Sequence, residues 1–77
     1  MIPVTFTHRE QQIIRLLAAG YASPAIAREL GIGRRTVKSY TDRLRLMLNV
    51  QTLRELPVAY MAATGDDPFP RPGEGTA

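Results

Sequence analysis

The sequence predicts an all-α domain of four helices, and three features of the chain carry this prediction. Apolar residues recur at helical spacing in several segments. Capping residues precede these segments and glycines follow them, which is the order typical of helices. Finally, Gly31-Ile32-Gly33 separates a short helical segment from a longer, strongly basic one, as in a helix-turn-helix unit.

The first helix is expected to begin near Thr7. Thr7 and Glu10 have the spacing of a capping box, in which each side chain satisfies a backbone N–H at the helix start. The apolar stripe of this helix consists of Ile13, Ile14 and Leu17. Gly20 can adopt the left-handed conformation that ends a helix, so we expect the helix to stop just before it.

The second helix has Ser23 as its expected N-cap and Pro24 at the first helical position, where the missing N–H costs nothing. Its predicted buried side consists of Ile26, Ala27 and Leu30. Gly31 can take the positive φ that a tight turn between helices requires. We expect Ile32 to enter the core between the two glycines.

The third helix is predicted over residues 34–48, with Asn49 as its C-cap. A helical wheel separates the two sides of this segment clearly. The packing side consists of Val37, Thr41, Leu44 and Leu48. The opposite side, which is polar, consists of Arg35, Lys38, Ser39 and Asp42.

A fourth helix is predicted within residues 53–64. Thr52 and Glu55 form a second capping box, but Pro57 removes a hydrogen bond, so the helix either starts nearer Pro57 or bends there. Leu56 through Thr64 contain no charge, and a helix that is apolar all round is buried on two sides. We therefore expect a partner on its outer face, at Val58, Ala59, Met61 and Ala62.

Composition limits the remaining possibilities. Seventy-seven residues make one domain, predicted over 1–64, and the Pro- and Gly-rich residues 65–77 are expected to be a disordered tail. A domain this small commonly needs additional stabilisation. With no cysteine and one histidine, disulfides and metal sites are excluded as its source, which leaves oligomerisation. We expect no cofactor and no enzymatic activity. The chain lacks a signal peptide or an apolar run that could span a membrane, so a cytoplasmic protein is expected.

The charge distribution favours a polyanionic partner. Residues 1–64 contain nine Lys or Arg and four Asp or Glu, a net charge of +5, whereas residues 65–77 have a net charge of −2. The basic third helix follows a short helix and a tight turn, and such a unit can place its second helix in the major groove of DNA. We interpret the chain as a DNA-binding transcriptional regulator.

The sequence resembles the LuxR/NarL/FixJ-type helix-turn-helix domain over about residues 4–64. The matching segments are Phe6-Thr7-His8-Arg9-Glu10, Leu16-Leu17-Ala18-Ala19-Gly20, Ile26-Ala27-Arg28-Glu29-Leu30-Gly31-Ile32, Arg35-Thr36-Val37-Lys38-Ser39-Tyr40 and Arg43-Leu44. The resemblance implies a four-helix domain whose third helix recognises double-stranded DNA and whose fourth helix forms a homodimer. The chain is similar to the free-standing, GerE-like members of the family. It departs from the family pattern at His8, at Pro24-Ala25, at Ser39-Tyr40 and at Asp42.

Seven residues are the candidate DNA contacts: Arg34, Arg35, Thr36, Lys38, Ser39, Asp42 and Arg43. Lys38 is the leading candidate for a base contact, because an ammonium can donate to guanine O6 and N7. Arg34 and Arg35 stand at a helix start, where the helix dipole does not favour cations, which indicates phosphates nearby.

Asp42 allows two interpretations. Its carboxylate could accept a hydrogen bond from cytosine N4, or it could pair with Lys38 or Arg45 on the same helix, which we prefer. Two alternative functions also follow from the sequence. One is a module that contacts RNA polymerase, as the related domain of a sigma factor does. The other is a protein-interaction subunit that forms a heterodimer with another LuxR-type regulator through the fourth helix.

Overall fold

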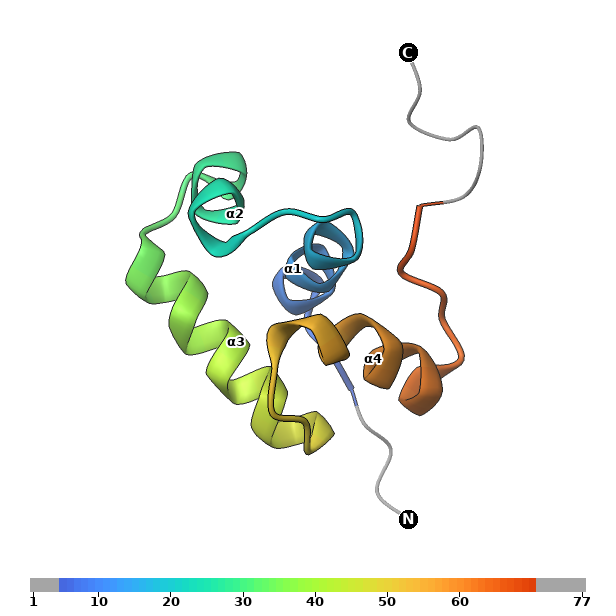
Figure 1. Cartoon of the computed structure of the whole chain (residues 1–77). Coiled ribbons are helices and arrows are strands. Elements are labelled where there is room, and N and C mark those ends of the chain that lie inside the picture. The colour runs from blue at the N-terminus through green and yellow to red at the C-terminus, as the bar shows by residue number, and fades with distance from the viewer. Residues whose placement is uncertain (1–4, 71–77) are drawn as a thin grey trace.

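The structure is a computed structural model, and it describes residues 5–70 as a bundle of helices (Figure 1). Its elements are α1 (His8–Ala18), α2 (Ser23–Leu30), α3 (Arg34–Leu48), a short 3₁₀ turn η1 (Leu53–Glu55) and α4 (Leu56–Thr64). None of the described residues lies in a strand, and the prediction of an all-α, four-helix domain is confirmed. Within residues 5–70 no helix combines the length and the apolar character needed to cross a bilayer.

Local signals begin and end α1 as the sequence predicts. The Thr7 hydroxyl accepts a hydrogen bond from the Glu10 N–H (3.2 Å), and the Glu10 carboxylate accepts one from the Thr7 N–H (2.8 Å), which completes the capping box. At the other end Gly20 has a φ of +98°, and the Tyr21 N–H donates to the Leu16 carbonyl. This pairing closes the helix as a Schellman motif and turns the chain toward α2.

The turn between α2 and α3 depends on Gly31. Gly31 has a φ of +67°, and the Ile32 N–H then donates to the Ala27 carbonyl at 3.0 Å. Ile32 is only partly buried and packs against the core from its edge. The start of α2 corrects the sequence analysis: Ala22 is the N-cap, no side chain caps this end, and Ser23 is already helical. Pro24 tolerates this shift because the second helical position also lacks an internal acceptor.

The segment after α3 resolves the conflict between Thr52 and Pro57. Asn49 ends α3 in the left-handed conformation, with a φ of +56°, as predicted. The Thr52–Glu55 capping box then begins η1, and α4 starts only at Leu56, so Pro57 falls in its first turn. Hydrogen bonds from Thr52 and Gln51 hold the pKa of the Glu55 carboxyl below its usual value.

One small apolar core joins all four helices. The fully buried side chains are Ile13, Ile14, Ile26, Val37, Leu44 and Leu56. At the edge of this core Phe6 and Tyr60 pack edge to face, with ring centroids 5.0 Å apart. α1, α2 and α4 all pack on α3, and α1 lies between α2 and α4 in the view of Figure 1, so α3 is left at the surface along one side.

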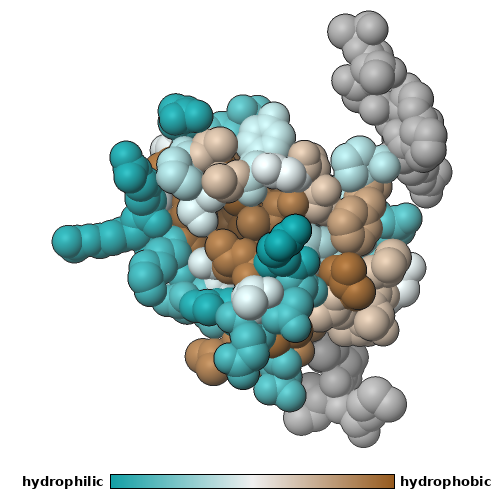
Figure 2. Space-filling view, viewed as in Figure 1, coloured by the Kyte–Doolittle hydropathy of each residue, from teal (hydrophilic) through white to brown (hydrophobic). Residues whose placement is uncertain are grey.

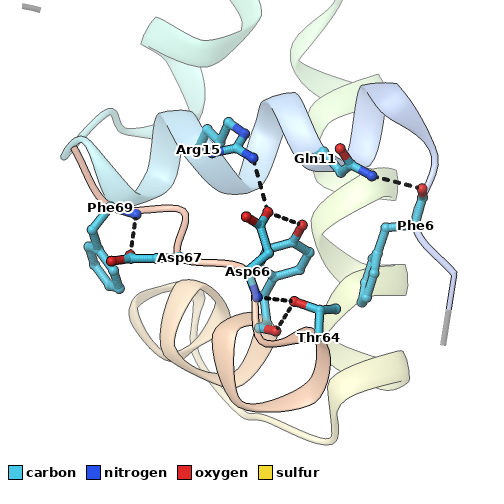
Figure 3. A network of polar contacts seen from close by, with 8 residues as sticks. Phe6, Gln11, Arg15, Thr64, Asp66, Asp67 and Phe69 are labelled. Atoms are coloured by element: carbon cyan, nitrogen blue, oxygen red, sulfur yellow. Dashed lines mark hydrogen bonds and ion pairs between the residues drawn. The ribbon is translucent and has the colours of Figure 1, made fainter. Parts of the chain in front are cut away.

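The chain beyond α4 is more closely packed than its composition predicts. Residues 65–70 form no helix or strand, but Asp66 accepts hydrogen bonds from Arg15 of α1 (2.9 Å) and from the Tyr60 hydroxyl (2.7 Å), as Figure 3 shows. Pro68 is buried and Phe69 is partly buried. We call residues 65–70 the C-terminal strap. The segment that was expected to be disordered thus begins with packed residues, because Asp66 is hydrogen-bonded to the Tyr60 hydroxyl and to the Arg15 guanidinium. Residues 71–77 lie outside the described part of the chain.

Candidate nucleic-acid interface

The polar side of α3 forms a hydrophilic flank of the molecule. Figure 2 shows it in teal on the left, over the helix labelled α3 in Figure 1. Val37, Thr41 and Leu44 are buried on the other side of the helix, as predicted from the helical wheel. The exposed candidate residues are Arg34, Arg35, Thr36, Lys38, Ser39 and Arg43. One helix therefore carries six of the seven candidate residues into solvent and anchors itself through the opposite side.

The first turn of α3 is electropositive for two reasons that add to each other. Gly33 is the N-cap and provides no side-chain acceptor, and the first backbone bond of the helix is from the Val37 N–H to the Gly33 carbonyl. The N–H groups of the first turn therefore have no acceptor within the helix, and they form the positive end of the helix dipole. The exposed guanidinium groups of Arg34 and Arg35 lie at the same end. This end of α3 can accept phosphate oxygens.

Asp42 pairs with two cations of its own helix. The Lys38 ammonium lies 2.9 Å from one carboxylate oxygen, and the Arg45 guanidinium bonds the other. Hydrogen bonds from Lys38 and then from Arg45 lower the pKa of Asp42, so the carboxylate is ionised at neutral pH. The structure thus contains both helix pairs that the sequence allows, while a contact to cytosine stays a prediction.

These pairs leave the two cations in different situations. Lys38 keeps 74% of its side chain exposed and is free to exchange Asp42 for another acceptor. Arg45 also donates to the Gln51 carbonyl at 3.1 Å, which ties it to the loop after α3. The ammonium of Lys38 is therefore the more available of the two for a ligand on this flank.

Arg43 connects the flank to α1. Its guanidinium lies 3.8 Å from the carboxylate of Glu10, which is almost completely buried, while 67% of the Arg43 side chain remains exposed. Glu10 therefore serves the capping box and orients Arg43 at the same time. The arginine can reach a phosphate without leaving its partner uncompensated, since one guanidinium offers five donors.

Leu46 belongs to this flank, although the sequence analysis did not select it. Its side chain is 83% exposed. It follows Ser39 by seven residues and Asp42 by four, a spacing that places the three side chains on one side of a helix. This spacing is the feature of the sequence that places Leu46 on the hydrophilic flank. Its aliphatic side chain lacks the hydrogen-bonding groups that the other candidate DNA contacts share.

The outer side of α4 is apolar and uncovered in the described structure. Leu56, Pro57 and Tyr60 bury the inner side, whereas Val58 is 54% exposed. Ala62 is exposed, and Ala59 and Met61 are partly exposed. The four residues predicted for a dimer interface thus lie on the sides of α4 that the core leaves free, and their contact with a partner stays a prediction.

Comparison with known protein families gives a match over most of the chain. The family described as bacterial regulatory proteins of the luxR family, with the GerE domain, matches residues 4–62, from just before the first cap to the last turn of α4. No curated protein and no solved structure matches the chain significantly. The matched residues include the whole of α2, the turn and α3, and therefore the entire hydrophilic flank.

Proposed function

The chain belongs to the luxR family of bacterial regulatory proteins, and from this membership we propose that it binds double-stranded DNA sequence-specifically, with α3 in the major groove, as a dimer formed through α4. A DNA-binding role in transcription regulation is the property of the family as a whole. The binding mode, the roles of single residues and the dimer are our proposal. The observation that carries it is the division of α3 into a buried apolar side and an exposed basic side.

Charge explains why the ligand of this flank should be a polyanion. Four exposed cations, which are Arg34, Arg35, Lys38 and Arg43, share the flank with one acid, and that acid is already paired within the helix. Neutralisation of phosphates by such side chains releases counterions and supplies most of the affinity of DNA-binding proteins. A protein partner of similar size would instead meet few apolar anchors on this flank.

We assign different positions along α3 to phosphate contacts and to base contacts. Arg34 and Arg35 occupy the first turn beside the unpaired N–H groups, so we assign them to phosphates together with Thr36. Lys38 lies one turn further on and is our candidate for guanine O6 and N7. Ser39 is short enough to let the helix approach the base edges. Arg43, held by Glu10, would contact the backbone on the other side of the groove.

The dimer rests on the outer side of α4. This helix has no charged residue, and apart from Thr64 at its end its exposed surface is contributed by Val58, Met61 and small alanines. Apolar surface of this kind gains free energy when a second copy covers it. Two copies related by a two-fold axis would present two α3 helices to half-sites about one helical turn apart, so the operator should be palindromic.

Selection from a pool of random duplexes tests the DNA-binding proposal. The wild type should recover a motif with two-fold symmetry, and Lys38→Ala should lose the preference at one position of each half-site. Arg54→Ala is the matched control, because Arg54 is an exposed cation on η1, away from the polar side of α3. Recovery of no motif by the wild type would contradict the proposal and direct attention to a protein partner, such as RNA polymerase or another regulator of the family.

Val58→Asp tests the dimer. A charge at the outer side of α4 should give a monomer, because burying an unpaired carboxylate costs more than the apolar contact supplies. Analytical ultracentrifugation and a DNA titration should show a monomer that binds a half-site weakly and without cooperativity. A variant that stays dimeric and binds the full site like the wild type would contradict the assignment of the interface to α4.

A further inference from the structure

Leu46 is the most exposed large apolar side chain in the described part of the chain, with 83% of its surface accessible. Single exposed leucines are common, so exposure alone has no meaning. Its place does. Residues 35, 39, 42 and 46 follow one another at spacings of four, three and four, which puts Arg35, Ser39, Asp42 and Leu46 in one row along α3.

The packing of α3 does not explain a leucine in this row. The core takes Leu44, and Leu48 packs against it, from the opposite side of the helix. Beside Leu46 lies a shallow hollow, lined also by Asp42, Arg45, Asn49, Val50 and Gln51. The Arg45 guanidinium donates to Asp42 and to the Gln51 carbonyl. The row thus ends in an aliphatic group, and the one cation that lines the hollow beside it, Arg45, is already bonded within the protein.

The major groove offers one apolar group to such a side chain, the C5 methyl of thymine. Resting on the proposed function, we propose that Leu46 is a specificity-determining residue that packs against a thymine methyl. Seven residues of helix separate it from Ser39, a rise of about 10 Å, or roughly three base-pair steps. The thymine should therefore lie about three base pairs from the position read near Ser39, in each half-site.

Replacement of thymine by deoxyuridine tests this contact, because the change removes only the methyl group. The substitution is made at each thymine of the selected site, and affinities are measured for the wild type, Leu46→Ala and Leu46→Met. At one thymine per half-site the wild type should lose about four-fold in affinity, the value expected for one methyl group withdrawn from an apolar contact. Leu46→Ala should bind the thymine and uracil sites equally, and Leu46→Met should restore the preference.

Lys38→Ala serves as the control, since it weakens binding but should keep the sensitivity to uracil. Equal losses on uracil sites for the wild type and Leu46→Ala would overturn the inference, and so would full tolerance of uracil by the wild type. In either case the selected motif still stands, and with it the proposed function. A change in oligomeric state of DNA-free Leu46→Ala would assign the leucine to a protein contact and also overturn the inference. Failure of the wild type to select any motif would overturn both proposals.

Discussion

Asp42→Asn separates the two interpretations of the acid on the recognition flank. In the free protein the carboxylate holds the Lys38 ammonium at 2.9 Å and also binds Arg45. The asparagine keeps the shape of the side chain but removes its charge. Lys38 then has no ionic partner on its own helix, and the flank that faces DNA gains one net positive charge. Binding to all DNA sequences should become stronger.

The size of the effect follows from counterion release. If the positive charge that the flank gains is equivalent to one additional phosphate contact, the slope of log K against log salt should steepen by about 0.9. Over a four-fold range of salt concentration, the affinity of Asp42→Asn relative to that of the wild type should therefore change by about three- to four-fold. The gain should appear at low salt and shrink as salt is added, because the Debye length shortens.

The assay is a fluorescence-anisotropy titration at several salt concentrations, on the selected operator and on a scrambled duplex. Asp67→Asn is the matched control, since it removes the same charge from the C-terminal strap, away from α3. A steeper slope on both duplexes for Asp42→Asn alone would support the helix-pair interpretation. An unchanged slope together with an altered preference at one base pair would refute it and show that Asp42 reads cytosine.

Two further predictions concern stability. Burial and the hydrogen bond to Asp66 raise the pKa of Tyr60 above 10.0, so the stability contributed by the neutral phenol is complete below pH 10 and is lost as the pH rises through the folded-state pKa. The melting temperature of the wild type should therefore fall at alkaline pH, and that of Tyr60→Phe should fall less. The same dependence of melting temperature on pH in both proteins would contradict this. Gly31→Ala forces a side chain into a φ of +67° and should cost about 1 to 2 kcal/mol in the free energy of unfolding by denaturant, whereas an unchanged midpoint would show that the turn can relax.

The helix boundaries could be predicted because they are encoded locally. The Thr7–Glu10 box and the left-handed residue Asn49 act within one turn of the chain, and both lie in the structure where the sequence indicates. The structure begins α3 at Arg34 and ends it at Leu48, as predicted from the sequence. The Ser23 cap failed by one residue, since an extended backbone at Ala22 begins α2 without any side-chain acceptor.

The features that could not be predicted depend on contacts between distant residues. Asp66 reaches Arg15 across 51 positions, and no local pattern announces that a Pro- and Gly-rich segment will be anchored by one acid. The pairing of Glu10 with Arg43 could be proposed from the two helices, but its 3.8 Å separation required their packing.

The most direct test of the central claim, that α3 reads the major groove, is methylation interference on the selected operator. Methylated guanine carries its methyl group at N7 in the major groove, whereas methylated adenine carries it at N3 in the minor groove. We expect interference at guanine N7 in both half-sites, and we expect Lys38→Ala to lose it at the guanine that Lys38 contacts. Interference confined to adenine N3, or a pattern unchanged in Lys38→Ala, would contradict the placement of α3 and of Lys38 in the major groove.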